Sequence, residues 1–233
     1  MPSKVFTIGI SGPSCSGKTT LTRILQKALK HTAVIYQDDF FKSDSDIPVD
    51  PKTKLQNWDC PNALDFDKLN ECVNYAIKHC KLPEGFISKE EENKHDGSTQ
   101  VSGHVLDGLS KLATAFEDTL FLIVDGFMLY WDQQLYQQFD CKIFITASYT
   151  TLKTRRENRQ GYVTTEGYWA DPPGYFDAIV WPEYVRWNQH LFQGTNHSEI
   201  EHEAVEDVLV LNTDDLSIDQ VADAAVQRLL DKV

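Results

Sequence analysis

The sequence predicts a single α/β domain in which a parallel β-sheet carries helices on both faces. Short apolar runs alternate along the 233-residue chain with segments whose apolar side chains recur at helical spacing. One run, residues 120–124, is apolar without interruption, which is typical of a central parallel strand buried on both faces. Strands that alternate with helices favour a parallel sheet, because parallel neighbours need a long crossover connection.

The first half of the chain supplies two of the expected strands, at residues 5–10 and 33–36. A glycine-containing turn follows the first strand, and helical spacing of the next apolar residues predicts a helix that begins near Lys18. The second strand ends at a pair of aspartates. Asp65 is then placed to cap a helix whose apolar face extends to Cys80.

The second half adds three strands, which we expect at residues 120–124, 141–146 and 208–211, and three helices, of which two are expected at residues 151–159 and 181–192. Pro182 would lie in the first turn of its helix, where a missing N–H costs little. A last helix begins after Ser217, because Ser217 and Gln220 have the spacing of a capping box.

Residues 83–118 interrupt this alternation. The stretch from Lys89 to Ser98 is charged, aperiodic and poor in apolar residues. We therefore expect a mobile polar insertion on the surface of one domain that spans residues 1–233.

Composition limits the classes of partner. Thirty-five acidic and twenty-two basic residues give a net charge of −13, which repels a polyphosphate backbone, so we expect no nucleic-acid partner. We also expect no membrane span, no signal peptide and no obligatory protein partner. The five cysteines are odd in number and lack zinc-ligand spacing, which predicts reduced thiols in a cytoplasmic protein.

A phosphate-binding loop is indicated between the first strand and its helix. Residues 12–19 read G-P-S-C-S-G-K-T, a complete Walker A pattern. The glycines let backbone N–H groups approach phosphates, Lys18 reaches the β- and γ-phosphate oxygens, and Thr19 offers a hydroxyl to Mg²⁺. A glycine-rich turn that binds nothing is the alternative. We expect a nucleoside triphosphate to contact Gly12, Pro13, Ser14, Cys15, Ser16, Gly17, Lys18, Thr19 and Thr20.

A second nucleotide signal is Asp125, which the apolar strand at 120–124 delivers beside this loop. In P-loop proteins such an aspartate holds Mg²⁺, whereas an ordinary Asp-Gly turn is the alternative. The chain contains no guanine-reading N-K-x-D motif and none of the coupling motifs of ATP-driven motors. These features favour a small-molecule kinase, which needs an acceptor pocket, a base and mobile positive charge.

Asp38 and Asp39 follow the second strand in the stretch Q-D-D-F-F-K. Ligands of an open α/β sheet bind beyond the carboxyl ends of its strands, so we expect this pair near the γ-phosphate. One carboxylate can accept the proton of an attacking hydroxyl and help to hold Mg²⁺, while the other serves the turn. A turn in which both aspartates bind only backbone N–H groups is the alternative.

Positive charge is concentrated in one short segment of this acidic chain. Arg155, Arg156 and Arg159 lie within five residues of one another. They predict a lid, at about residues 153–174, whose charge neutralises the transferred phosphate. Gly161 and the Pro-Pro-Gly bend at 172–174 would bound its moving part, and a solvated basic helix face is the alternative.

A tryptophan next to a carboxylate marks the candidate acceptor site. Trp58 can stack on a flat ring while Asp59 bridges a ribose 2′,3′-diol, and cation–π attraction would favour a pyridinium ring. Tyr162, Tyr168 and Trp169 are candidates for the opposite wall. The alternative is a core tryptophan beside an aspartate that caps a helix.

Together these stretches resemble the nicotinamide riboside kinases, within the uridine kinase-like branch of the P-loop kinases. The resemblance covers residues 4–82 and 119–188. It rests on G-I-S-G-x-x-x-S-G-K-T-T-L, Q-D-D-F-F-K, L-Q-x-W-D and P-G-Y-F-D-x-x-V-W-P. It implies the P-loop NTPase fold and the ATP- and Mg²⁺-dependent phosphorylation of the 5′-hydroxyl of nicotinamide riboside for NAD synthesis, with nicotinic acid riboside as a second substrate.

The resemblance also implies roles on the phosphate side of the site. Asp38 matches the catalytic base and a Mg²⁺ ligand, and Thr19 matches the other direct metal ligand. Lys18 and Asp125 complete the catalytic set, although Asp125 stands where the family has a longer glutamate. The resemblance likewise implies roles for three arginines and a set of residues for the riboside site.

Arg155 matches an arginine that packs on adenine, Arg156 one that touches substrate, and Arg159 one on the ATP phosphates. The implied riboside site comprises Asp38, Asp39, Phe40, Phe41, Trp58, Asp59, Arg156 and Tyr162. Two alternatives remain open: a uridine/cytidine kinase, which shares the fold and the acceptor chemistry, and a non-catalytic nucleotide-binding protein.

Overall fold

The computed structural model describes residues 2–90, 100–159, 161–164, 167–191 and 207–232. Its centre is a five-stranded sheet in the order β2-β3-β1-β4-β7, in which all neighbours run parallel. The strands are β1 (Lys4–Ser11), β2 (Thr32–Tyr36), β3 (Thr119–Gly126), β4 (Cys141–Thr146) and β7 (Val208–Asn212). The five predicted strands are all present, and the predicted fold class is confirmed.

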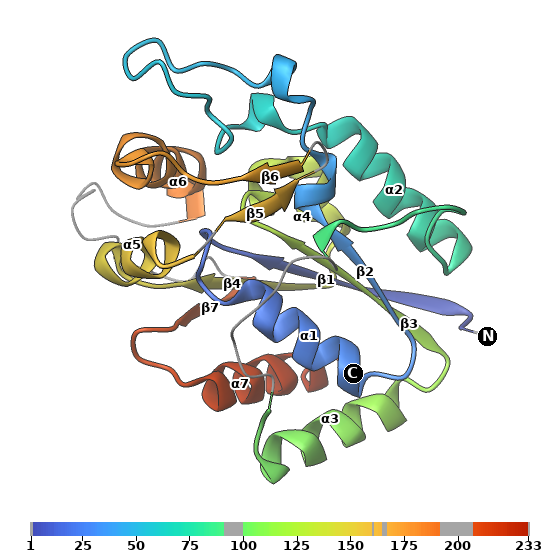
Figure 1. Ribbon diagram of the computed structural model, residues 1–233. Coiled ribbons are helices and arrows are strands. Elements are labelled where there is room, and N and C mark those ends of the chain that lie inside the picture. The colour runs from blue at the N-terminus through green and yellow to red at the C-terminus, as the bar shows by residue number, and fades with distance from the viewer. Residues whose placement is uncertain (1, 91–99, 160, 165–166, 192–206, 233) are drawn as a thin grey trace.

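Helices cover both faces of this sheet, as Figure 1 shows. One face carries α1 (Lys18–Ala28), α3 (Gly103–Ala115) and α7 (Ile218–Leu230). The other face carries α2 (Phe66–His79), α4 (Gln133–Gln138) and α6 (Trp181–Asn188). Each face holds its own cluster of buried apolar side chains, and β3 contributes to both because all of its residues are buried.

The predicted helix caps are present. The Asp65 side chain accepts a hydrogen bond of 3.1 Å from the backbone N–H of Lys68, at the start of α2. Ser217 and Gln220 form both bonds of a capping box at the start of α7. Two helix starts are therefore specified by the side chains immediately around them.

The helix predicted at 181–192 differs from the structure. A π-helical turn, η6 (Phe176–Val180), runs directly into α6, and a 3₁₀ turn, η7 (Gln189–Leu191), follows it. Phe192 lies outside the described residues. Pro182 does occupy the first turn of α6, directly after the π-helical turn.

The expectation of a surface insertion at 83–118 is wrong for its second half. Residues 103–115 form α3, which buries Val105, Leu109 and Leu112 against α1 and α7. The spacing of these three residues is helical, but the charged stretch before them obscured it. Gly108 allows the close approach to α7, because an added Cβ would lie 2.9 Å from Val226 Cγ1. Residues 91–99 lie outside the described part of the chain.

The predicted lid lies beyond the carboxyl ends of the strands (Figure 1). It comprises α5 (Tyr149–Glu157) and an antiparallel hairpin of β5 (Tyr162–Thr164) and β6 (Gly167–Trp169). A third cluster of buried side chains, which includes Trp58, Leu152 and Tyr175, lies beneath it. The remaining short helical turns are η1 (Gln37–Phe40), η2 (Asp44–Asp46), η3 (Pro61–Ala63) and η5 (Leu129–Trp131).

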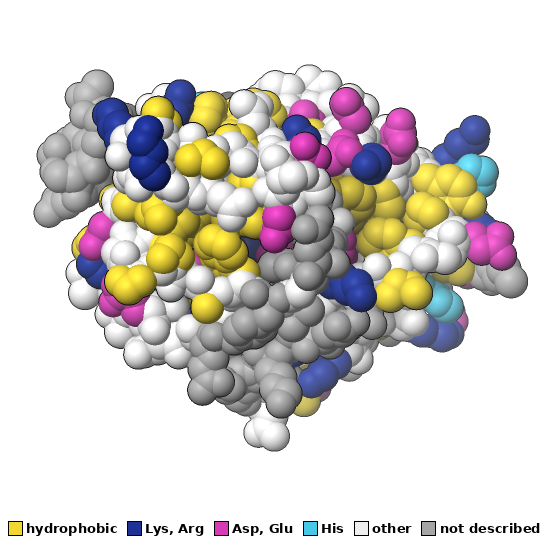
Figure 2. Space-filling view, turned by 45° about the horizontal axis from the view of Figure 1, so that its top comes forward, with side chains coloured by type: hydrophobic (Ala, Val, Ile, Leu, Met, Phe, Trp, Pro, Cys, Tyr) yellow, Lys and Arg dark blue, Asp and Glu magenta, His cyan; other side chains and the backbone are white. Residues whose placement is uncertain are grey.

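Three further features concern the hydropathy of the helices, the distribution of charged side chains and the cysteines. Among the residues that the structure describes, no helix has both the length and the apolar character needed to cross a membrane. Figure 2 shows acidic and basic side chains both spread over the face that it draws, so the net charge of −13 does not form one acidic patch on that face. All five cysteines are free thiols.

Candidate active site

The phosphate-binding loop joins β1 to α1. Gly12 has a φ of 142°, and a Cβ at this position would lie 1.9 Å from the backbone oxygen of Ile145 in β4. Only glycine fits there, because both the backbone conformation and the contact exclude a side chain. Gly17 (φ 108°) precedes the first residue of α1 in the same left-handed region of φ. The loop is therefore held in a fixed curve against the sheet.

This loop fits a chain of phosphates. The Ser16 hydroxyl is buried with no hydrogen-bond partner among the described residues. Lys18 Nζ donates to the Pro13 carbonyl oxygen at 3.0 Å, across the mouth of the loop. The N-terminus of α1 adds unsatisfied backbone N–H groups and a favourable dipole for an anion.

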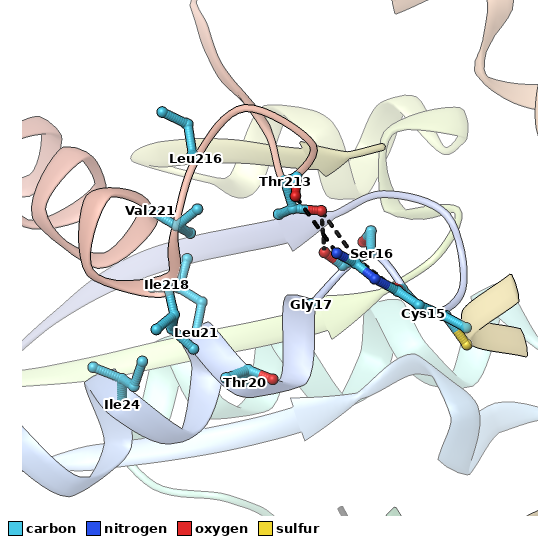
Figure 3. A pocket seen from close by; sticks show the side chains of 11 residues that line it. Cys15, Ser16, Gly17, Thr20, Leu21, Ile24, Thr213, Leu216, Ile218 and Val221 are labelled. Atoms are coloured by element: carbon cyan, nitrogen blue, oxygen red, sulfur yellow. Dashed lines mark hydrogen bonds between the residues drawn. The ribbon is translucent and has the colours of Figure 1, made fainter. Parts of the chain in front are cut away.

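A pocket of about 440 Å³ extends from the loop towards α7, as Figure 3 shows. Arg155 spans one side, with Nη1 2.9 Å from Thr213 Oγ1 and 3.3 Å from the Cys15 carbonyl oxygen. The far end is apolar and is formed by Leu21, Ile24, Leu216, Ile218 and Val221. A guanidinium beside an apolar pocket can pack on a flat base, which is the role that the resemblance implies for Arg155.

Two carboxylates lie at the carboxyl edge of the sheet beside the loop. Asp125 of β3 is aligned with Tyr36 at the end of β2, directly before η1 and Asp38. Asp125 is 4% exposed, and its Oδ2 accepts a hydrogen bond of 3.0 Å from Thr22 Oγ1. Burial raises the pKa of Asp125 to about 6, although the Lys18 charge and bonds from Thr22 and Thr19 oppose the rise.

Asp38 lies in η1 at the carboxyl edge of the sheet, where part of the residue is exposed. Protein surrounds it on the remaining sides, and this loss of bulk solvent, followed by the charge of Glu90, raises its pKa to about 7. Lys18 and Arg159 act in the opposite direction. A carboxylate with a raised pKa between cationic groups has the properties of a general base.

Asp39 and Phe40 do not reach the expected riboside site. Asp39 Oδ1 accepts a hydrogen bond of 2.8 Å from the backbone N–H of Lys89. The Phe40 ring stacks on Phe86, with ring centroids 6.3 Å apart. Both side chains therefore face residues 86–90, because η1 is a 3₁₀ turn that directs Asp38 and Asp39 to different sides.

Aromatic rings surround the candidate acceptor side of the cleft. Trp58 lies 5.4 Å from Phe41 and 5.5 Å from Trp169, measured between ring centroids, and Phe41 stacks on Phe127 at 5.9 Å. Trp58 is 8% exposed, and its indole N–H has no partner among the described residues. Tyr162 belongs to β5, but its side chain lies outside the described part of the structure.

Asp59 is buried next to this aromatic group. Burial raises its pKa to about 6, Arg156 opposes the rise most strongly, and Lys18 opposes it as well. Lys18 thus acts electrostatically on Asp38, Asp59 and Asp125 together. The candidate base and the candidate diol ligand therefore both lie within electrostatic reach of the lysine of the phosphate loop.

Arg156 connects the lid to the phosphate loop. Its Nη1 donates to Ser14 Oγ at 2.8 Å, and Nε and Nη2 donate to the two carboxylate oxygens of Asp171. Trp169 Nε1 donates to the same carboxylate at 2.9 Å. Arg156, which was expected to touch substrate, is thereby held at the junction of lid, loop and aromatic group.

Comparison with known proteins identifies the family. A model described as an AAA domain matches residues 8–166. Nicotinamide riboside kinase of Schizosaccharomyces pombe is 36% identical over 82% of this chain and 83% of its own length. The Saccharomyces cerevisiae enzyme is 35% identical over 81% and 80%, and nicotinamide riboside kinase 1 of Homo sapiens is 32% identical over 81% and 79%. The chain belongs to the nicotinamide riboside kinase family.

As a member of this kinase family, the chain is a phosphotransferase that uses ATP. Among the described residues, no three His, Cys, Asp or Glu side chains form a ready-made metal cluster. The donors present are hydroxyl and carboxylate oxygens, from Thr19, Asp38 and Asp125. Such a set fits Mg²⁺, which binds to one or two carboxylates and takes its other ligands from phosphates and water.

Four residues of this kinase site were missed in the sequence. Thr22 holds Asp125, Thr213 holds Arg155, and Asp171 holds Arg156. Glu90 lies in the segment that was set aside as an insertion. Thr213 carried a weak signal, because it follows the last predicted strand at the carboxyl edge of the sheet.

Proposed function

We propose that this kinase transfers the γ-phosphate of ATP to the 5′-hydroxyl of nicotinamide riboside, and also of nicotinic acid riboside, as a step of NAD synthesis. One observation carries the proposal. The charge of Lys18 opposes the rise in the pKa values of Asp38, Asp59 and Asp125, so the candidate base, the candidate diol ligand and the metal-side carboxylate lie around one ammonium group. The printed names of the relatives support the choice of acceptor.

On the phosphate side, Asp38 would accept the proton of the attacking hydroxyl. Its pKa of about 7 suits this role, because a base is most effective when its pKa lies near the working pH. Lys18 and the lid arginines would stabilise the charge on the transferred phosphoryl group. Mg²⁺, held by Thr19 and Asp38 with Asp125 nearby, would supply charge neutralisation and orient the phosphates.

On the acceptor side, Asp59 would bind the ribose diol through charge-assisted hydrogen bonds. Phe41, Trp58 and Trp169 would provide an aromatic surround for the pyridine ring. A positively charged nicotinamide ring gains cation–π attraction there and is further favoured by the carboxylate. Uracil and cytosine carry no such charge, which favours the nicotinamide acceptor over the pyrimidine one.

The proposal requires two small-molecule substrates and no nucleic acid, membrane or obligatory protein partner. The five free thiols support a reducing, cytoplasmic location.

ATP consumption should be measured with nicotinamide riboside, nicotinic acid riboside, uridine and cytidine, in wild type and in Asp59→Asn. We expect turnover with the two pyridine ribosides and a loss of turnover in the variant. Turnover restricted to uridine or cytidine would identify a pyrimidine kinase, and no riboside-dependent ATP consumption would indicate a binding protein.

A further inference from the structure

Residues 86–90 are docked on the catalytic turn η1. The backbone N–H of Lys89 donates to Asp39 Oδ1, and Phe86 stacks on Phe40, two contacts that join the segment to consecutive residues of the turn. Ser88 is 8% exposed and Glu90 is 7% exposed, although both are polar. Residues 86–90 are therefore an ordered segment that packs against η1.

Glu90 directly follows Lys89, whose backbone bonds to Asp39, the neighbour of Asp38, so the docking holds the buried Glu90 near Asp38. The charge of Glu90 raises the pKa values of Asp38, Asp39 and Asp125, and for Asp38 it is the largest effect after burial. Like charges that are buried together are unfavourable unless a cation balances them. The cations that the structure brings to Asp38 are Lys18 and Arg159.

Glu90 would add a third carboxylate, beside Asp38 and Asp125, to a site that must hold a metal–nucleotide complex. The side chain of Asp125 is shorter than that of a glutamate, and it already accepts a hydrogen bond from Thr22. Each added negative charge strengthens the attraction of a divalent cation, and weakens that of a nucleotide without its metal. The role considered for Glu90 is that of a nearby negative charge, which needs no direct bond to the metal.

Resting on the proposed function, we propose that Glu90 is a positioning residue for the metal–nucleotide complex, carried to the Asp38–Asp125 side of the cleft by the docking of residues 86–90 on Asp39. Its charge makes the site select ATP that carries Mg²⁺ over ATP that does not. Asp39 then acts as the anchor of this segment, which explains why its carboxylate faces Lys89 and not the acceptor.

Calorimetric titration of the wild-type chain with ATP, with and without Mg²⁺ and without any riboside, tests the proposal. We expect Glu90→Gln to reduce the preference for Mg²⁺-loaded ATP by about fivefold to tenfold, the scale of one screened charge. Glu84→Gln is the matched control, because Glu84 is an exposed carboxylate two residues before the docked segment and should leave the preference unchanged. Thermal unfolding of each variant verifies that the fold is retained.

A second variant tests whether Asp39 anchors the segment, and it keeps the proposal testable if Glu90→Gln does not fold. Asp39→Ala removes the acceptor of the Lys89 bond and should reduce the metal preference in the same direction. The double variant Asp39→Ala/Glu90→Gln should lose no more than Glu90→Gln alone, because both changes act through one carboxylate. An unchanged metal preference in Glu90→Gln, or fully additive losses in the double variant, would overturn the inference. Since no riboside is present, this result is independent of the acceptor panel that tests the proposed function.

Discussion

Arg156 binds both carboxylate oxygens of Asp171, with Nε 2.6 Å from Oδ2 and Nη2 3.0 Å from Oδ1. The pair is largely buried, since the Arg156 side chain is 8% exposed and that of Asp171 is 20% exposed. The remaining bond of the guanidinium to Ser14 extends the pair into the phosphate loop. One ion pair thus joins the end of α5, the end of the lid hairpin and the loop that binds phosphate.

Asp171→Asn should lower the free energy of unfolding by about 2 kcal/mol, because it leaves a buried guanidinium with a neutral, weaker partner. Chemical denaturation measures this loss. Asp177→Asn is the control, because Asp177 pairs with Lys153 of α5, the helix that also carries Arg156, and this ion pair is exposed; the loss should stay within about 1 kcal/mol. Equal losses in the two variants would contradict the importance of burial for the Arg156 pair.

Lys18→Ala should abolish phosphoryl transfer while the unfolding free energy stays within about 1 kcal/mol of wild type, because Lys18 is the first residue of α1 and its side chain is not part of the core. Gly12→Ala should instead destabilise the fold by more than about 2 kcal/mol. Its new Cβ meets the backbone of Ile145, which cannot move without shifting β4. Activity assays and denaturation of both variants separate the two effects, and an unfolded Lys18→Ala chain would contradict the assignment.

Asp38→Asn should reduce kcat by at least ~10²-fold, the usual loss when a general base is removed. Asp39→Asn should remain within about tenfold of wild type, because the Asn carbonyl oxygen can still accept the bond from Lys89. Both kcat values should be measured at saturating ATP, riboside and Mg²⁺. If the Asp39 variant is the inactive one, the two roles are exchanged.

Riboside binding should weaken as the pH falls through about 6, the raised pKa of Asp59. Below this pH the carboxylate gains a proton and loses its strongest interaction with the diol, so Kd rises about tenfold for each further unit. The sign for stability is the opposite: Asp59 binds its proton more tightly when folded, so its contribution to the free energy of unfolding improves as the pH falls from about 6 towards the unfolded value of 3.8.

Calorimetric measurement of riboside Kd between about pH 5 and pH 8 tests this behaviour. The control is Asp59→Asn, which should bind weakly at every pH and show no inflection near pH 6. A wild-type profile that matches the variant would remove Asp59 from the acceptor site.

The sequence by itself determined the parallel sheet, the phosphate loop, the capped starts of α2 and α7, and the position of Asp125 at the carboxyl edge. These features depend on neighbouring residues: an apolar run, a glycine that permits positive φ, or a side chain that bonds to its own helix. Because these causes act within a few residues, they can be recognised in the sequence without the tertiary structure.

Only the tertiary structure decided the role of residues 86–90, the partner of Arg156 and the directions of Asp38 and Asp39. The Lys89 to Asp39 bond joins residues fifty positions apart, and Arg155 meets Thr213 across fifty-eight. No local pattern encodes such pairs, because they form when separate elements pack at the same edge of the sheet. The aspartates also lie in a 3₁₀ turn, where strand alternation no longer sets the direction of a side chain.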